Sequence, residues 1–227
     1  MNSLEVIFEV LRGAPLIDYL SFHTFPEMKP VQESEPDWNE EERHMFVRAL
    51  EFKKMGMSFW DGIMLSTFNN PGYSERLLHQ ALRHNTHPLL TFVAKDNLSV
   101  WLEDHTRSID TIALCSKVIM ASGEELHLPL IDFHIPFFET NVRVVVSVCS
   151  MLGLYDGWIL NSGESYHFIG AKPMCYTDLE QLLCKALMYT PIIDKAWISH
   201  QLREHSCSLR IGRKRGVYPI VVKKLKE

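Results

Sequence analysis

The chain has 227 residues, of which 46% are hydrophobic and 22% are charged, enough for one large domain or for a core domain with an extension. This composition excludes a disordered protein, and a net charge of −5 excludes a protein that binds nucleic acid through its overall charge. The apolar runs are only as long as strands, which excludes a membrane span of about 20 residues.

The N-terminal segment predicts no signal peptide, because Glu5 and Glu9 interrupt its apolar stretch and it has no basic start. The cysteines are scattered and form no C-x-x-C pair, which favours a reducing compartment and excludes a recognisable zinc knuckle. We therefore expect a cytoplasmic protein without a membrane partner.

Residues 1–110 are predicted to form a mainly helical portion with one hairpin, packed on a core of residues 111–227. Asn39 precedes three glutamates, the pattern of a capped helix that ends at Gly56. A second helix is expected from Ser74, and alternation around Asp96 and Asn97 predicts the hairpin. The run from residue 108 to 123 predicts a short helix that ends at Gly123.

The second half predicts a β-α-β-β-α-β order, the split βαβ arrangement of an α/β (α+β) fold, similar to an RNA-recognition-motif fold. In this arrangement the first strand lies between the third and the fourth. The expected strands are 128–135, 157–161, 165–171 and 208–211, and the expected helices are 139–153, with a stop at Gly153, and 178–189, opened by a capping box at Thr177 and Glu180. A short helical stretch around 194–203 and a last strand after a basic turn complete the order.

Alternation along these strands sends polar side chains to the face that the helices leave open. Asp132 and His134 leave the first strand on the same side, because two residues is the strand period. The third and fourth strands send Ser165, His167, Ser208 and Arg210 to the same surface, and Asp194 lies just before the fourth strand. A polar cluster at the centre of an uncovered sheet is a candidate site.

The motifs on these strands resemble those of the archaeo-eukaryotic primase superfamily, the primase-polymerases. That family has a D-x-D/E motif, an S-x-H motif and a hydrophobic-Asp motif, followed by a strand with arginine and a basic turn. The matching segments, which span residues 126 to 222, are "LIDFHIP", "LNSGESYHFIG", "PIIDKAWISHQL" and "SLRIGRKRGVYP".

The resemblance implies metal-dependent nucleotidyl transfer from a nucleoside triphosphate onto a nucleic-acid strand, with DNA the expected nucleic acid. Asp132, His134 and Asp194 would be the catalytic metal ligands, and Ser165, His167 and Arg210 would bind the nucleotide. The basic turn of Arg213, Lys214 and Arg215 would contact nucleic acid.

His134 departs from the family pattern, because it stands where the second acidic residue of D-x-D/E is expected. An imidazole in place of a carboxylate shifts the expected metal from Mg²⁺ toward Mn²⁺ or Zn²⁺. Two other functions therefore stay open: an inactive module that binds nucleotide or nucleic acid, and a mononuclear metal-dependent hydrolase. A structural reading also stays open, in which Asp132 and His134 form a hydrogen-bonded pair, Asp194 caps a helix and the basic turn is a solvated hairpin tip.

Overall fold

A computed structural model describes residues 1–25, 39–55, 57, 59–66, 89–106, 111–214 and 216–226. The chain divides into two compact units, one of Met1–Pro26 with Leu89–Glu227 and one of Glu27–Pro88. The boundary predicted after residue 110 does not coincide with this division. None of the described helices has the length and apolar character needed to cross a membrane.

The smaller unit contains helices α2 (Glu40–Lys54) and α3 (Phe59–Ser66). The side chain of Asn39 accepts a hydrogen bond from the Glu42 amide, and Glu42 bonds back to the Asn39 amide, so the predicted cap is confirmed. Gly62 lets the two helices meet closely, since a Cβ there would lie 3.0 Å from the Ala49 backbone. The predicted stop at Gly56 and the predicted helix from Ser74 lie outside the described residues.

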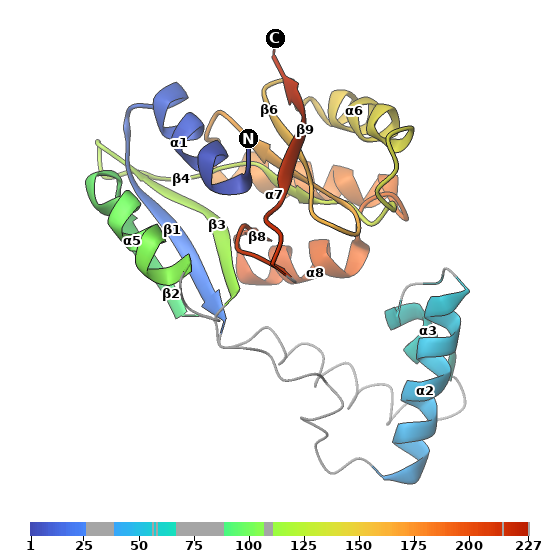
Figure 1. Ribbon diagram of the computed structural model, residues 1–227. Coiled ribbons are helices and arrows are strands. Elements are labelled where there is room, and N and C mark those ends of the chain that lie inside the picture. Colours follow the sequence, from blue (N-terminus) through green and yellow to red (C-terminus); the bar gives the residue numbers. More distant parts are fainter. Residues whose placement is uncertain are drawn as a thin grey trace. The chain divides into compact units, whose positions relative to one another are not determined.

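The larger unit contains two antiparallel sheets (Figure 1). The first has the order β2-β1-β3-β4, and β8 also pairs with β3. Its strands are β1 (Ile17–Phe25), β2 (Leu89–Ala94), β3 (Thr111–Met120), β4 (Glu125–His127) and β8 (Ser208–Arg210). Helix α1 (Ser3–Gly13) precedes β1, while η1 (Lys95–Asn97) and α5 (Leu98–Thr106) follow β2.

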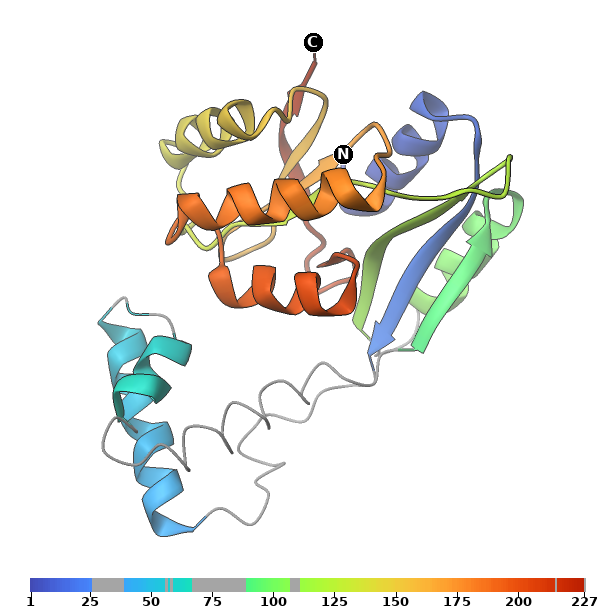
Figure 2. The same ribbon diagram turned by 180° about the vertical axis from the view of Figure 1, so that it is seen from behind.

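The second sheet has the order β5-β7-β6-β9 and carries most of the motifs. Its strands are β5 (Leu130–Asp132), β6 (Gly157–Asn161), β7 (Tyr166–Gly170) and β9 (Ile220–Leu225). Helices α6 (Asn141–Leu152) and α7 (Tyr176–Ala186) flank this sheet, η2 (Leu187–Tyr189) follows α7, and α8 (Lys195–Glu204) lies beside α7, as Figure 2 shows from behind. Ile131, Tyr166 and Phe168 are fully buried, as the alternation predicts.

Two elements predicted in the first half of the chain are wrong. Residues 111–120 form the central strand β3 rather than a helix, and its residues 112–116 are all buried, so no alternation marks it as a strand. Gly123, with φ of 83°, serves the turn between β3 and β4 instead of ending a helix. The predicted hairpin is strand β2 followed by helix α5, whose Leu98 and Leu102 are buried one turn apart.

The predicted split βαβ order holds for three of its four strands. β5 pairs with β7, and β7 pairs with β6. The predicted fourth strand, β8, instead pairs with β3 in the other sheet, where Leu209 is opposite Leu114. β9 pairs with β6, and among the described strands β5 pairs only with β7, so β5 lies at an edge of its sheet.

Helix α7 begins two residues earlier than predicted, with Cys175 at the N-cap and no side-chain capping bond. The predicted strand 128–135 is longer than the observed β5, which spans Leu130–Asp132, so His134 lies beyond the strand; β6 has the predicted bounds. Helix α6 is closed by Gly153 in the left-handed conformation, with φ of 83°. The mixed α/β class is confirmed.

Candidate functional site

The pairing of β5 with β7 brings two of the predicted site residues together. Asp132 is directly opposite His167 in the register, so their side chains leave the same face of the sheet. His167 Nε2 lies 3.5 Å from Asp132 Oδ1. The next residues on each strand, Ile131 and Phe168, are fully buried on the other face.

A cavity of about 280 Å³ opens beside this pair, between the two sheets. The second sheet contributes β5, β7 and the turn that joins β6 to β7, whereas the first sheet contributes β8. The predicted surface on one sheet is therefore a pocket between two sheets. Its lining residues are Asp132, Ser162, Glu164, Ser165, His167, Trp197, Ser208, Leu209, Arg210 and Lys214.

Arg210 reaches the pocket from β8 and is held by backbone carbonyls. Its Nη1 donates to Gly212 O at 2.7 Å, and its Nη2 donates to Ser162 O at 2.5 Å. Burial lowers the pKa of Arg210, but a guanidinium remains charged in a protein. The pocket therefore contains one fixed positive charge beside the hydroxyls of Ser162 and Ser165, which lie 3.2 Å apart.

Asp132 and His167 are both driven toward their neutral forms. Burial raises the pKa of Asp132 to about 8, and the charge of Asp194 adds to the rise. Burial, with a smaller effect from Arg210, lowers the pKa of His167 to about 3. Near neutral pH their contact therefore joins a protonated carboxyl group and a neutral imidazole rather than two ions.

Asp194 caps helix α8, as the structural reading predicts. Its Oδ1 accepts from the amides of Ala196 and Trp197, at 2.8 and 3.1 Å. Its Oδ2 lies 3.8 Å from His134 Nδ1, and its amide donates to Asp132 O at 3.3 Å. The N-cap thus leaves one carboxylate oxygen beside the D-x-H segment.

Asp132 and Asp194 carry carboxylate oxygens, the kind of donor that a hard divalent ion prefers. The two carboxyl groups are close enough for the charge of one to raise the pKa of the other, a repulsion that a cation would relieve. His134 lies beside Asp194, with its Nδ1 3.8 Å from Asp194 Oδ2, but neither of these two residues lines the pocket that contains Asp132. Across the part of the chain that the structure describes, however, no three His, Cys, Asp or Glu side chains already converge as metal ligands.

The basic turn begins at the mouth of the pocket. Lys214 Nζ lies 3.3 Å from Glu164 Oε1, in the turn between β6 and β7. The Arg213 guanidinium lies over the Tyr218 ring, 4.9 Å from its centre. Arg215 lies outside the described residues.

Sequence reasoning missed Trp197, which lines this pocket, and His23, which contacts the pocket residue Ser208. Trp197 lies three residues after Asp194, and its indole Nε1 donates to Ser208 O at 3.0 Å. Ser208 Oγ is 2.6 Å from Nδ1 of the buried His23, on β1. An N-cap at Asp194 bonds the Trp197 amide, so a predicted cap could have pointed to Trp197. No pattern in the sequence connects His23 with Ser208, which is 185 residues away.

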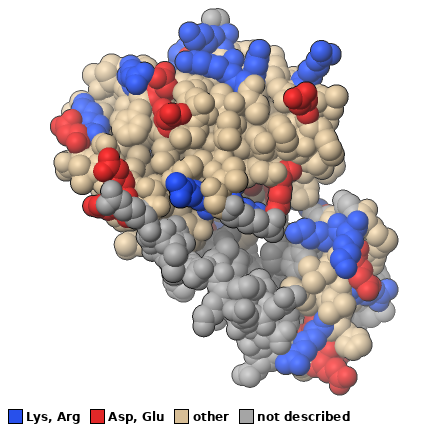
Figure 3. Space-filling model, viewed as in Figure 1, with Lys and Arg blue, Asp and Glu red and all other residues tan. Residues whose placement is uncertain are grey.

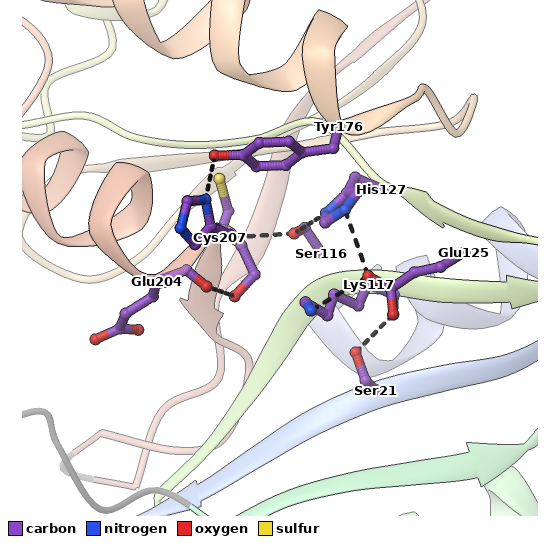
Figure 4. A network of polar contacts seen from close by, with 10 residues as sticks. Ser21, Ser116, Lys117, Glu125, His127, Tyr176, Glu204 and Cys207 are labelled. Carbon is purple, nitrogen blue, oxygen red and sulfur yellow. Dashed lines mark hydrogen bonds and ion pairs between the residues drawn. The ribbon is translucent and has the colours of Figure 1, made fainter.

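A second polar network lies at the junction of β3, β4 and β8 (Figure 4). Ser116 Oγ is 3.0 Å from His127 Nδ1, and His127 Nε2 is 3.8 Å from Glu125 Oε1. The order resembles a nucleophile, base and acid, but Ser116 is fully buried and its hydroxyl accepts from the Cys207 amide at 2.8 Å. The bond between Ser116 and the Cys207 amide holds β3 against the residue before β8, and so helps to position Arg210.

Comparison with protein-family models gives a match over the second half of the chain. A family model described as AEP-like, archaeo-eukaryotic primase 1D-like, matches residues 96–223. No curated protein and no solved structure matches the chain. The matched region includes every predicted site residue, from Asp132 to Arg215, and excludes α1, β1 and the smaller unit.

Proposed function

The chain belongs to the archaeo-eukaryotic primase 1D-like family, and on that premise we propose that its pocket binds a nucleoside triphosphate with a divalent metal ion for nucleotidyl transfer onto a nucleic-acid strand. The observation that carries the proposal is the meeting of Asp132, Ser165, His167 and Arg210 in one pocket of about 280 Å³. Its volume is near the lower end of the range for small-ligand sites, enough for a phosphate chain.

Each side chain has a role that its surroundings support. Arg210, fixed by two carbonyls, would neutralise phosphate charge, and Ser165 and the neutral His167 would donate hydrogen bonds to phosphate oxygens. Asp132, Asp194 and His134 would hold the metal. A metal bound there, Mn²⁺ before Mg²⁺ or Zn²⁺, would supply Lewis acidity for the attack of a 3′-hydroxyl.

The basic turn would guide the strand. Arg213 and Lys214 are exposed beside the pocket, and phosphate contacts of such residues are insensitive to base sequence. We propose that Arg213, Lys214 and Arg215 contact the backbone of the nucleic acid, with DNA the expected substrate. Lys214 would then exchange its ion pair with Glu164 for a phosphate.

Primer extension with Mn²⁺ tests the proposed function. The native protein should extend a primer on a single-stranded template, and Asp194→Asn should not. Asparagine is as good an N-cap as aspartate, so this variant keeps the cap of α8 and removes only the charge. If Asp194→Asn extends primers as well as the native protein does, Asp194 serves only as a cap.

An inactive module that binds nucleotide without transfer is the second candidate. It is favoured by one observation, that no three potential metal ligands converge among the described residues. This candidate predicts nucleotide binding that depends on Arg210, together with no extension under any metal. Metal content of the purified protein separates it from a mononuclear hydrolase, which would retain a tightly bound ion.

His134→Asp should change the metal preference. The native protein is expected to bind Mn²⁺ more tightly than Mg²⁺, because an imidazole nitrogen is a poor ligand for Mg²⁺. Aspartate adds a hard oxygen donor beside Asp194, so Mg²⁺ affinity should rise by about tenfold. Titration calorimetry with each ion measures this change. A native protein that binds Mg²⁺ more tightly than Mn²⁺ would contradict it.

A further inference from the structure

A second hollow lies away from the nucleotide pocket, between helix α6 and strand β9. It has a volume of about 540 Å³ and is lined by Val146, Ser150, Leu154, Tyr155, Lys223, Lys224, Leu225 and Lys226. We call these residues the α6–β9 groove. Because β9 and β5 are the two edges of one sheet, three strand spacings of roughly 4.8 Å separate the groove from the strand that carries Asp132.

The groove is positively charged in a chain whose net charge is −5. Its lining includes three lysines and no acidic residue. Lys223 and Lys226 form no ion pair with the described residues, whereas Lys224 lies 3.9 Å from Glu9 and over the Trp158 ring. Figure 3 shows Lys and Arg side chains gathered near the C-terminal end of the chain, at the top of the view.

An aromatic side chain and an apolar floor accompany these charges. Tyr155 is 50% exposed. Beneath the opening, Leu154 is buried and Leu225 is half-buried. Lysines on an edge strand also prevent edge-to-edge pairing of sheets, but that role needs neither a groove nor an exposed ring. The combination of unpaired cations with an aromatic ring is typical of surfaces that bind single-stranded nucleic acid.

We propose that the α6–β9 groove binds single-stranded nucleic acid outside the nucleotide pocket. Lys223 and Lys226 contact phosphates, and Tyr155 stacks on a base. The strand that enters the groove lies beyond the edge of the sheet opposite β5, so the groove adds affinity without contacting the reacting nucleotide. This inference goes beyond the proposed function, because it requires no catalysis.

Fluorescence anisotropy with a labelled single-stranded oligonucleotide, measured over a salt series, tests the groove. Lys223→Gln with Lys226→Gln should weaken binding by about fivefold and reduce the slope of log affinity against log salt by about 1.4, two phosphate contacts at about 0.7 each. Tyr155→Ala should weaken binding by about tenfold and leave the slope unchanged. The matched control is Lys95→Gln with Lys185→Gln, which removes the same charge from exposed positions elsewhere.

The outcome separates the groove from the nucleotide pocket. If the groove variants bind the oligonucleotide like the control variant, the lysines only protect an edge and the proposal is overturned. If the groove is correct, Arg210→Ala should lose triphosphate binding and keep most of its oligonucleotide binding. A groove variant that loses triphosphate binding as well would contradict the separation of the two sites.

Discussion

Replacing Asp132 by asparagine is expected to abolish nucleotidyl transfer and to stabilise the folded protein at the same time. Transfer should fall by at least about 100-fold, because the variant lacks a carboxylate for the metal. The gain in stability has a separate cause, which lies in the burial of the carboxyl group beside Asp194. Loss of activity with a gain in stability marks a residue kept for function rather than for folding.

The direction of the pH dependence follows from the raised pKa. The folded protein holds the Asp132 proton up to about pH 8, whereas an unfolded chain releases it near pH 3.8. Between these values the unfolded state binds fewer protons, so the native protein loses stability as the pH rises. Asparagine does not titrate, and the advantage of the variant should therefore be absent at pH 3.5 and largest above pH 8.

Thermal unfolding at pH 3.5, 6 and 8.5 measures this advantage. Because the Asp132 side chain is 28% exposed, water screens part of its cost, and we expect a gain of about 2 kcal/mol at pH 8.5. For a chain of this size, such a gain raises the midpoint by roughly 4–8 °C. Asp96→Asn, at an exposed position, is the control and should change neither stability nor transfer. A variant of Asp132 that is less stable than the native protein at pH 8.5 would contradict this account.

Arg210→Ala is expected to weaken nucleoside triphosphate binding by about 100-fold. The guanidinium is already fixed by the carbonyls of Ser162 and Gly212, so it loses little further freedom when a phosphate binds. Its removal deletes the fixed positive charge of the pocket and leaves two carbonyls without this donor. The loss should correspond to about 2–3 kcal/mol, the range for a buried charge that is hydrogen-bonded.

Arg210→Lys is the matched variant, because it keeps the charge and removes the planar fork. Lysine cannot bond both carbonyls and a phosphate with the same geometry. We therefore expect Arg210→Lys to bind the triphosphate only about tenfold more tightly than Arg210→Ala does. Titration with a non-hydrolysable triphosphate in the presence of Mn²⁺ gives both affinities. If Arg210→Ala binds the triphosphate within threefold of the native protein, or loses nucleic-acid binding to the same degree, Arg210 does not hold the triphosphate.

The strands of the second sheet were predictable because local signals agree there. Gly157 begins β6, Gly163 lies in the turn between β6 and β7, and the alternation places Tyr166 and Phe168 in the core. Helix α1 was missed despite a readable signal, since Asn2 and Glu5 form a capping box before the buried Val6 and Val10. No local signal shows which sheet β8 joins, because a strand of three residues can pair equally well with any compatible sheet edge.

The candidate site was predictable in part for the same reason. Asp132 and His167 share a face through strand period and a single pairing, both readable from sequence. Arg210 shares their pocket only because β8 pairs with β3 and faces the second sheet. This pairing joins segments that are far apart in the sequence. His23 contacts the site through Ser208, a contact between β1 and β8 that no motif encodes, whereas Trp197 and Glu164 stand inside quoted motifs that give no sign that they line the pocket.

A crystal structure of the protein with Mn²⁺ and a non-hydrolysable nucleoside triphosphate tests the central claim most directly. We expect the ion to contact the carboxylates of Asp132 and Asp194, and the phosphates to contact Arg210, Ser165 and His167 in the pocket between the two sheets. A triphosphate bound at any other place, with the Arg210 guanidinium still facing an empty pocket, would contradict it.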